Sequence, residues 1–118
     1  MPQYMLLLHE DPSAFATISP DDMQKIVERY VAWGTRLREA GLLADSHKLT
    51  DEPGRVMRGR PGQVRVTDGP YSETKEVLGG YFLINAATYD EAVQRARDCP
   101  HLEYGGTIEV RQVDTMGQ

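Results

Sequence analysis

The sequence predicts one α+β domain over residues 1–118, with an antiparallel sheet covered on one face by two helices. Three observations lead to this fold class. Two segments, 3–9 and 80–87, are apolar on both faces, which is typical of central strands. Helical segments with capping signals follow them at 20–40 and 89–98. The other strand signals are shorter and more polar, so the element order is β-α-β-(hairpin)-β-α-β.

The first helix has clear signals at both ends. Ser19 is a suitable N-cap, Pro20 fits the first helical position, and the acids that follow favour the positive end of the helix dipole. Gly41 stands where a left-handed C-cap is needed. Apolar side chains recur between these ends every three or four residues and are expected to form one buried stripe: Met23, Ile26, Val27, Tyr30, Trp33, Leu37 and Ala40.

The second helix begins with a capping box, in which Thr88 is followed three residues later by Glu91. We expect it to run to about Asp98 and to be stopped by Pro100. Its buried side chains are expected to be Ala92, Val93, Ala96 and Cys99.

The strands are separated by turn and breaker residues. The first ends where Pro12 and its acidic neighbours interrupt strand pairing. Gly59-Arg60-Pro61-Gly62 is turn chemistry between two short strands, which predicts a hairpin. After the first strand, the remaining strands are expected at 42–49, 55–58, 63–67, 80–87 and 107–113.

This order fits a ferredoxin-like sandwich, whose central strands are the first strand and the strand before the second helix. Those are the two segments that are apolar on both faces. Two helices cover only one side of the sheet, so the second apolar face is expected to meet the sheet of another subunit. The sequence therefore predicts a homodimer through sheet-to-sheet packing, with a cavity between the sheets.

Charge and composition exclude several classes of partner. The formal net charge of −5 and the pI of about 5.1 argue against nucleic-acid binding, which depends on neutralising phosphates. Residues 55–65 are a local exception, with four arginines and no acid, and two interpretations stay open there: a site for a small anion or a solvated hairpin. The single cysteine permits no internal disulfide. No membrane span or signal peptide is apparent, so we expect a cytoplasmic location.

The segment 68–81, DGPYSETKEVLGGY, is the main candidate site. Asp-Gly-Pro predicts a turn, because glycine tolerates positive φ and proline fixes φ, and a cluster of ionisable residues lies between two strands. Two interpretations stay open: the cluster contacts a ligand, or it forms an ion-pair network that orders the loop. Glu109 and Arg111, on one face of the last strand, are expected to pair with it. The candidate ligand-binding residues are Glu73, Lys75, Glu76 and Arg111.

Three histidines are candidates for proton transfer, because imidazole titrates near neutral pH. His101 is expected at the surface, and His9 to close the first strand. His47 lies in a strand from which it is expected to approach Asp68, so these two residues are the candidate catalytic pair, with a structural role for His47 as the alternative. No metal-ligand spacing occurs, so neither a metal nor a cofactor is expected.

The string DGPYSETKEVLGGYFLI, with the helix ending near Cys99-Pro100 and the closing strand IEVRQV, resembles the YCII-related domain in its DGPF-motif branch. Tyr71 stands where the motif's name has phenylalanine. The resemblance covers nearly the whole chain. It implies a dimeric α+β barrel, mostly of unknown function and often encoded beside extracytoplasmic-function sigma factors. Related domains include a dehydrochlorinase of chlorinated hydroxyquinones.

The resemblance also implies a histidine near the start of the first helix and an aspartate before the proline that follows the second helix. This chain has neither, since the first helix opens Pro20-Asp21-Asp22-Met23 and Cys99 precedes Pro100. That pair is therefore not carried over. Asp98 is a poor substitute, because one helical residue turns a side chain by about 100°.

Two functions from different classes stay open. The first is a small ligand-binding domain, with a regulatory role or a partner such as a sigma factor. The alternative is a cofactor-free lyase or isomerase that acts on a small polar or aromatic ring compound by proton transfer. No catalytic constellation can be completed from these residues, which favours the ligand-binding domain.

Overall fold

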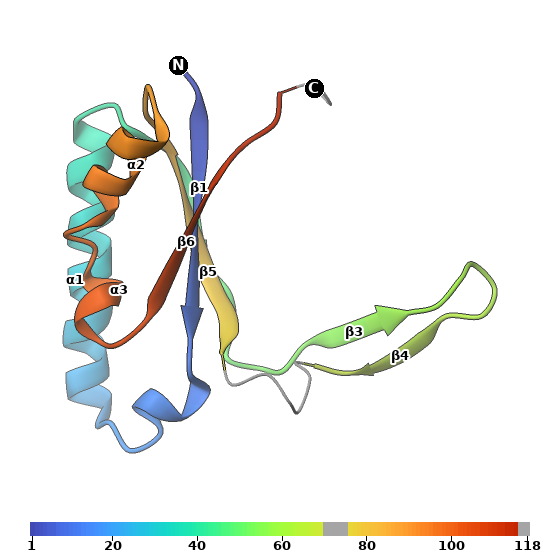
Figure 1. Cartoon of the computed structure of the whole chain (residues 1–118). Coiled ribbons are helices and arrows are strands. Elements are labelled where there is room, and N and C mark those ends of the chain that lie inside the picture. The colour runs from blue at the N-terminus through green and yellow to red at the C-terminus, as the bar shows by residue number, and fades with distance from the viewer. Residues whose placement is uncertain (70–75, 116–118) are drawn as a thin grey trace.

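The computed structural model describes residues 1–69 and 76–115 (Figure 1). Its elements confirm the α+β class and the predicted order, with two short helices added. In chain order they are β1 (Gln3–Glu10), the 3-10 helix η1 (Pro12–Phe15), α1 (Pro20–Glu39), β2 (Leu43–Lys48), β3 (Arg55–Arg58), β4 (Arg65–Asp68), β5 (Val77–Asn85), α2 (Tyr89–Ala96), α3 (Pro100–Glu103) and β6 (Thr107–Gln112).

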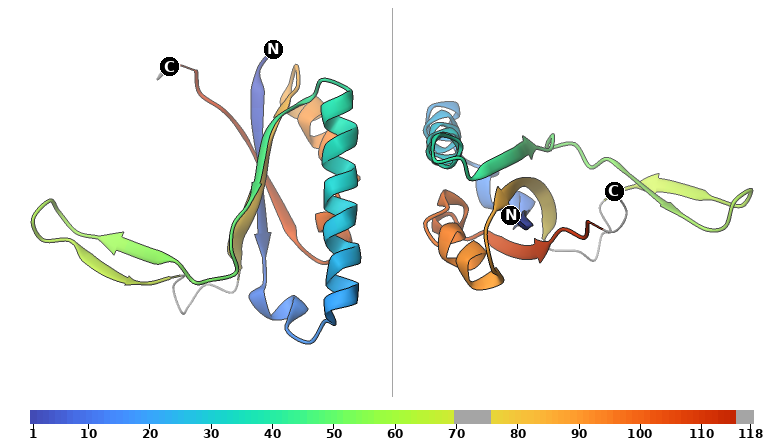
Figure 2. Two further views of the ribbon diagram at one scale, coloured as in Figure 1. Left: turned by 180° about the vertical axis from the view of Figure 1, so that it is seen from behind. Right: turned by 90° about the horizontal axis from the view of Figure 1, so that it is seen from above.

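The main sheet has four antiparallel strands in the order β2-β5-β1-β6. The two strands predicted to be central, β1 and β5, are central. The helices lie together on one face of this sheet, and within the described residues no helix or strand covers the other face (Figures 1 and 2). We call this second surface the open face.

The core lies between the sheet and the helices. Alternate residues of the two central strands point into it, and Leu6 and Ile84 are fully buried. Trp33 of α1 packs its ring edge-on against Phe82 of β5, with 4.9 Å between ring centroids. Such contacts between aromatic rings add to the free energy of burial. Other buried core residues are Tyr4, Leu8, Leu37, Ala86, Ala92, Ala96 and Cys99.

The helix signals are confirmed at the N-termini. The Ser19 hydroxyl accepts a hydrogen bond from the Asp22 amide at 3.1 Å, and the Thr88 hydroxyl accepts one from the Glu91 amide at 3.1 Å. The C-terminal prediction for the second helix was wrong in detail. α2 ends at Ala96, and Pro100 opens α3 because proline fits the first turn of a helix.

The sets of helix side chains predicted to be buried include some that are exposed. Val27 in α1 and Val93 in α2 were expected to be buried, but they are 38% and 37% exposed. Ala40 is exposed too. Each helix contacts the sheet along a narrower line than its run of apolar residues suggests.

β5 begins at Val77, three residues before the predicted start, because pairing with β1 continues through a bulge between Leu8 and His9. Gly80 allows this strand to approach β2. A Cβ atom on Gly80 would lie 2.7 Å from the carbonyl oxygen of His47, which is too close for any side chain.

Gly69 also serves the close approach of two chain segments. Its φ does not lie in the left-handed region, whereas that of Gly54, which faces it across the base of the hairpin, is 72°. A Cβ atom on Gly69 would lie 2.8 Å from Val56 Cγ2 and 3.1 Å from the Pro53 carbonyl oxygen. The Gly69 amide donates to the Gly54 carbonyl at 3.2 Å, which closes the hairpin base.

The β3–β4 hairpin is a separate two-stranded sheet that projects from the rest of the chain (Figures 1 and 2). The radius of gyration is 16.2 Å, whereas a compact domain of this length has about 13 to 14 Å. We call residues 55–68 the arm.

Candidate functional site

The open face has an apolar centre. Antiparallel partners share a face of a sheet, and Met5 of β1 lies opposite Leu83 of β5, while Leu7 lies opposite Tyr81. These side chains are half-buried in the single chain. We call Met5, Leu7 and Leu83 the apolar strip.

One polar cluster borders the apolar strip on the β2 side. Asp45 Oδ2 accepts a hydrogen bond from the Tyr81 hydroxyl at 2.7 Å, and its Oδ1 lies 3.3 Å from His47 Nε2. The rings of His47 and Tyr81 lie 5.8 Å apart between centroids. The Tyr81 hydrogen bond holds the pKa of the Asp45 carboxyl below its usual range, and Asp45 in turn raises the pKa of Tyr81. We call these three residues the Asp45 cluster.

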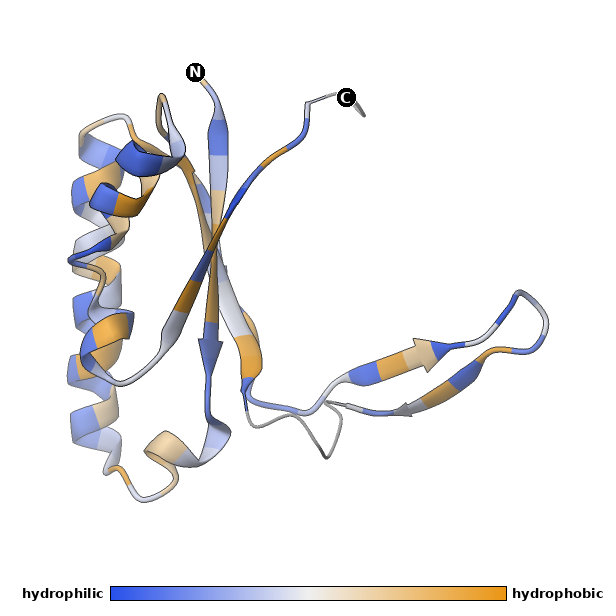
Figure 3. Ribbon diagram, viewed as in Figure 1, coloured by the Kyte–Doolittle hydropathy of each residue, from blue (hydrophilic) through white to orange (hydrophobic). Residues whose placement is uncertain are grey.

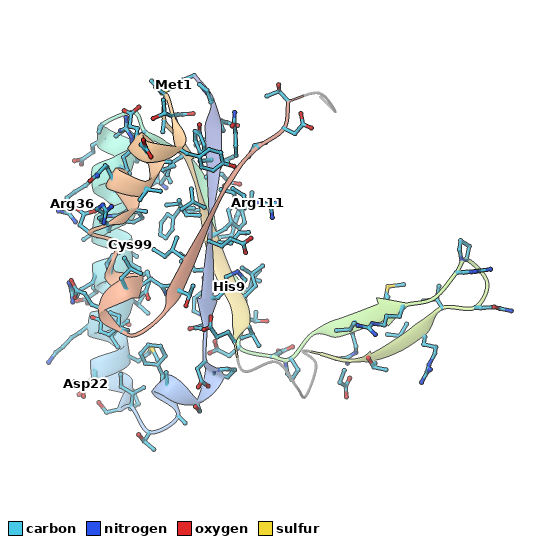
Figure 4. All side chains as sticks on the ribbon, viewed as in Figure 1. Met1, His9, Asp22, Arg36, Cys99 and Arg111 are labelled. Atoms are coloured by element: carbon cyan, nitrogen blue, oxygen red, sulfur yellow. The ribbon has the colours of Figure 1, made fainter. Side chains whose placement is uncertain are left out.

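A second polar cluster borders the strip on the β6 side. Glu109 Oε1 lies 3.0 Å from His9 Nε2, and Glu109 Oε2 accepts a hydrogen bond from Arg111 Nη1 at 3.3 Å. The hydrogen bond with His9, and after it that with Arg111, lowers the pKa of the Glu109 carboxyl. Arg111 points away from the helices (Figure 4). We call these three residues the Glu109 cluster.

The register aligns the two clusters. His47 lies opposite Tyr81, Tyr81 opposite Leu7, and Leu7 opposite Glu109, so one row crosses all four strands. Neighbouring strands are about 4.8 Å apart, so the row is about 14 Å long. A small ligand lying on the apolar strip would therefore meet polar groups at both ends.

The predicted pair of His47 and Asp68 is not brought together by any described contact. His47 is 67% exposed and belongs to the Asp45 cluster. The Asp68 carboxylate lies 3.3 Å from Arg55 Nη1 at the base of the arm, because the two residues are partners in the β3–β4 register.

The predicted ligand-binding residues divide into three groups. Glu73 and Lys75 lie outside the described residues. Glu76 Oε1 accepts a hydrogen bond from the Thr107 hydroxyl at 3.4 Å, which connects the end of the loop to β6. Arg111 pairs with Glu109 of its own strand.

Sequence reasoning missed Asp45 and Tyr81 as candidate site residues, and it expected His9 to close the first strand. Alternation offers a signal for His9 and Tyr81, because they share the parity of Met5, Leu7 and Leu83 on the central strands. Alternation offers no such signal for Asp45, because the register of β2 against β5 shifts between Leu43 and Asp45. An irregular register cannot be read from parity alone.

The expectation that His101 lies at the surface was wrong. It is 4% exposed, its Nε2 donates to the His9 carbonyl at 2.7 Å, and its Nδ1 lies 2.9 Å from the Tyr30 hydroxyl. Burial raises the pKa of Tyr30. Since both ring nitrogens have protein partners, His101 ties α3 to β1 and α1.

Cys99 is a core residue, as predicted. It is 1% exposed, and burial raises the pKa of its thiol to about 11. A thiol with so high a pKa carries little thiolate at neutral pH, so it is a poor nucleophile.

Within residues 1–69 and 76–115, no group of three or more His, Cys, Asp and Glu side chains is arranged to hold a metal ion. In the same part of the chain, no helix is long and apolar enough to cross a membrane. The open face thus offers phenol, imidazole, carboxylate and guanidinium groups beside an apolar surface. These groups can bind a small polar molecule and exchange protons with it.

One family model matches nearly the whole chain. The model of the YCII-related domain matches residues 2–116. An uncharacterized protein of Rhizobium meliloti (strain 1021) is 33% identical over 110 residues, which cover 92% of this chain and 89% of that protein. Among solved structures, 5-chloro-2-hydroxyhydroquinone dehydrochlorinase from Burkholderia phenoliruptrix AC1100, in complex with 2,5-dihydroxybenzoquinone, aligns at a TM-score of 0.47 with 13% identity. That alignment covers 97% of this chain and 94% of the other.

Proposed function

The chain belongs to the YCII-related domain family, and on that premise we propose that it is a small-ligand-binding domain whose site is the open face of the sheet. One observation carries the proposal. An apolar strip at the centre of this face is bordered by the Asp45 cluster and the Glu109 cluster, and the strand register aligns them in one row. A surface with an apolar floor and a few convergent polar groups is typical of ligand sites.

Within the family, we assign the chain to the DGPF-motif branch. The support is the string from Asp68 to Gly80, DGPYSETKEVLGG, which resembles the motif of that branch. The resemblance also motivates a cytoplasmic, regulatory role beside an extracytoplasmic-function sigma factor.

The proposed site is completed by a homodimer of ferredoxin-like subunits. A second copy placed over the open face would bury the apolar strip, which a single chain leaves half-buried. A two-fold axis would place the row of residues that crosses the sheet opposite the same row of the second copy, as in an isologous interface. The enclosed space would then be lined by two Asp45 clusters and two Glu109 clusters, as in a dimeric α+β barrel.

The groups on the open face favour a small, flat, polar ligand. The ring of Tyr81 and the apolar strip offer stacking and van der Waals contact, and Arg111 offers a positive charge. A ring compound with hydroxyl or carboxylate substituents fits this combination. A large ligand does not, because the strip is narrow.

A second candidate is a cofactor-free lyase or isomerase that works by proton transfer. The observation in its favour is the 3.0 Å contact between His9 Nε2 and Glu109 Oε1. A carboxylate that orients an imidazole is the usual arrangement for a general base, and the His9 side chain is 29% exposed, so it is accessible from the open face.

The test of ligand binding is a screen of hydroxylated and carboxylated ring compounds against the wild-type protein and Tyr81→Phe. The substitution removes the hydroxyl that donates to Asp45 and keeps the ring. We expect the affinity of genuine hits to fall about tenfold. Tyr104→Phe is the matched control, because that hydroxyl accepts from Arg29 on the helix side of the chain. Hits that bind both variants equally well would contradict the proposed site.

The two candidate functions are separated by following each hit over time. A compound that binds and is recovered unchanged supports the ligand-binding domain. Turnover that is abolished in His9→Gln while binding persists supports the proton-transfer enzyme.

The homodimer is tested with Leu7→Asp, which places a charge on the apolar strip. An unpaired charge at a buried interface costs several kcal/mol, so the variant should be monomeric while the wild type is dimeric at micromolar concentration. Sedimentation or light scattering gives the mass. A wild-type monomer would refute the assembly.

A further inference from the structure

The arm has an apolar surface that its own chain does not cover. Met57 and Val66 are direct partners in the β3–β4 register, so they lie on the same face of the hairpin. They are 67% and 57% exposed, and Val64, just before β4, is 43% exposed. Figure 3 shows hydrophobic segments on both strands of the projecting hairpin. We call Met57, Val64 and Val66 the arm stripe.

A two-stranded hairpin of this kind needs a second layer. An isolated hairpin is marginally stable in water, and a sheet normally buries one face against another element. β3 and β4 pair only with each other within the described residues, and both views in Figure 2 show the arm projecting away from the main sheet. The base, by contrast, is tightly built around Gly69 and Val56.

The charge of the arm identifies a suitable partner. The arm holds four arginines and one acid, Asp68, which pairs with Arg55, so the rest of the chain carries nine of the thirteen basic residues and seventeen of the eighteen acids. A second copy of the chain therefore offers an acidic body for Arg60 and Arg65, which lie beyond the base of the arm. The open face also presents an apolar strip bordered by Asp45 and Glu109.

The reach of the arm agrees with this partner. Each side of the hairpin has about seven residues at about 3.3 Å each, so the arm is about 20 Å long. The outer strands of the four-stranded sheet are about 14 Å apart. An arm that leaves one copy can therefore cross the sheet of another.

We propose that the β3–β4 arm is an exchanged arm, which packs the arm stripe on the open-face side of a second copy and sets its arginines against the acidic body of that copy. The inference shares the second copy with the proposed homodimer, but it needs no ligand. It assigns the basic segment at 55–65 to self-association, in place of an anion site or a freely solvated hairpin.

The experiment measures the dimer dissociation constant of the full chain by sedimentation. Met57→Asp and Val66→Asp place a charge on the arm stripe, and each should weaken the dimer at least tenfold. The matched control is Thr67→Asp, which adds the same charge on the same strand but on the opposite face. It should change the constant by less than about threefold. Circular dichroism verifies that each variant is folded.

A second measurement tests whether the arginines of the arm contact acidic side chains of the second copy. If they face an acidic body, raising the salt concentration from about 0.05 to 0.5 M should weaken the wild-type dimer. The double variant Arg60→Gln, Arg65→Gln should reduce that salt dependence. A salt dependence that is unchanged in the double variant would overturn the arginine contact.

The outcomes separate this inference from the proposed homodimer. If Leu7→Asp dissociates the dimer and the arm variants do not, the exchanged arm is refuted and sheet-to-sheet packing stands. If the arm variants dissociate it and Leu7→Asp does not, sheet-to-sheet packing falls, and the exchanged arm stands with its stripe packed on the second copy away from Leu7. Equal effects of Met57→Asp and Thr67→Asp, or binding of the arm to anionic vesicles without any change in mass, would also overturn the exchanged arm.

Discussion

At the scale of single residues, the role of each histidine is decided by what surrounds its ring. His101 is enclosed and bonded at both nitrogens, whereas His47 is 67% exposed and lies beside one carboxylate. The sequence places both residues among polar or helix-ending neighbours, so it cannot distinguish them. The difference arises because α3 folds back against β1, which brings residue 101 to residue 9 across 92 positions of the chain.

The buried histidine gives a prediction for stability. His101→Leu keeps the volume roughly constant but leaves the Tyr30 hydroxyl and the His9 carbonyl without a partner. Each unsatisfied buried group costs about 1–3 kcal/mol, so the free energy of unfolding should fall by about 2–6 kcal/mol. Urea unfolding measures it. His47→Leu is the control and should change stability by less than about 0.5 kcal/mol, because its ring is mostly exposed. Equal losses in the two variants would refute the structural role of His101.

At the scale of elements, local signals predicted helix starts better than strand limits. Ser19 and Thr88 cap α1 and α2 as expected, because a capping hydroxyl needs only an amide two or three residues away. The start of β5 was predicted at Gly80 and lies at Val77, since strand pairing depends on a partner far away in the chain. Gly80 serves the close packing of β5 against β2.

Gly80 gives the prediction at this scale. A Cβ atom there would lie 2.7 Å from the His47 carbonyl oxygen and 3.2 Å from Lys48 Cα, both of them backbone atoms of β2. Gly80→Ala should therefore push β2 away from β5 and cost about 1–3 kcal/mol of stability. Hydrogen exchange should show faster exchange in β2 than in β1. Leu78→Ala, at a position that is 42% exposed in the same strand, is the control. Slow exchange of β2 in Gly80→Ala would contradict the packing argument.

At the scale of the whole molecule, the sequence predicted the sheet and the helix layer on one side of it, but it did not determine which residues form the candidate site. The two doubly apolar segments identified the central strands, and the count of helices indicated an uncovered face. The membership of the Asp45 and Glu109 clusters depends on the register of four strands, and no local pattern determines that register. For the same reason, the pairing of His47 with Asp68 was a plausible guess that the described contacts do not support.

The charged partners on the surface make the stability of the whole chain sensitive to acid. The pKa values of four carboxyls lie below their usual range: Asp45 is held down by Tyr81, Glu91 by the Ala87 amide and then Arg95, Glu103 by Arg29, and Glu109 by His9 and then Arg111. A carboxyl whose pKa is lower in the folded chain stabilises the fold when it is ionised. That contribution is complete above the ordinary values of 3.8 for Asp and 4.5 for Glu, and it is lost as the pH falls through the lowered values.

The last prediction concerns how the stability of the chain changes with pH. The free energy of unfolding of the wild type should decrease as the pH falls from about 6 to about 3, because the unfolded chain takes up protons first. Glu91→Gln should flatten this decrease, since the amide cannot be protonated and still accepts from the Ala87 amide. Urea unfolding at each pH gives the slope. Glu39→Gln, at the exposed end of α1, should leave the slope of the wild type almost unchanged. Equal slopes in the wild type and Glu91→Gln would show that the partners of Glu91 do not hold its charge in the folded chain.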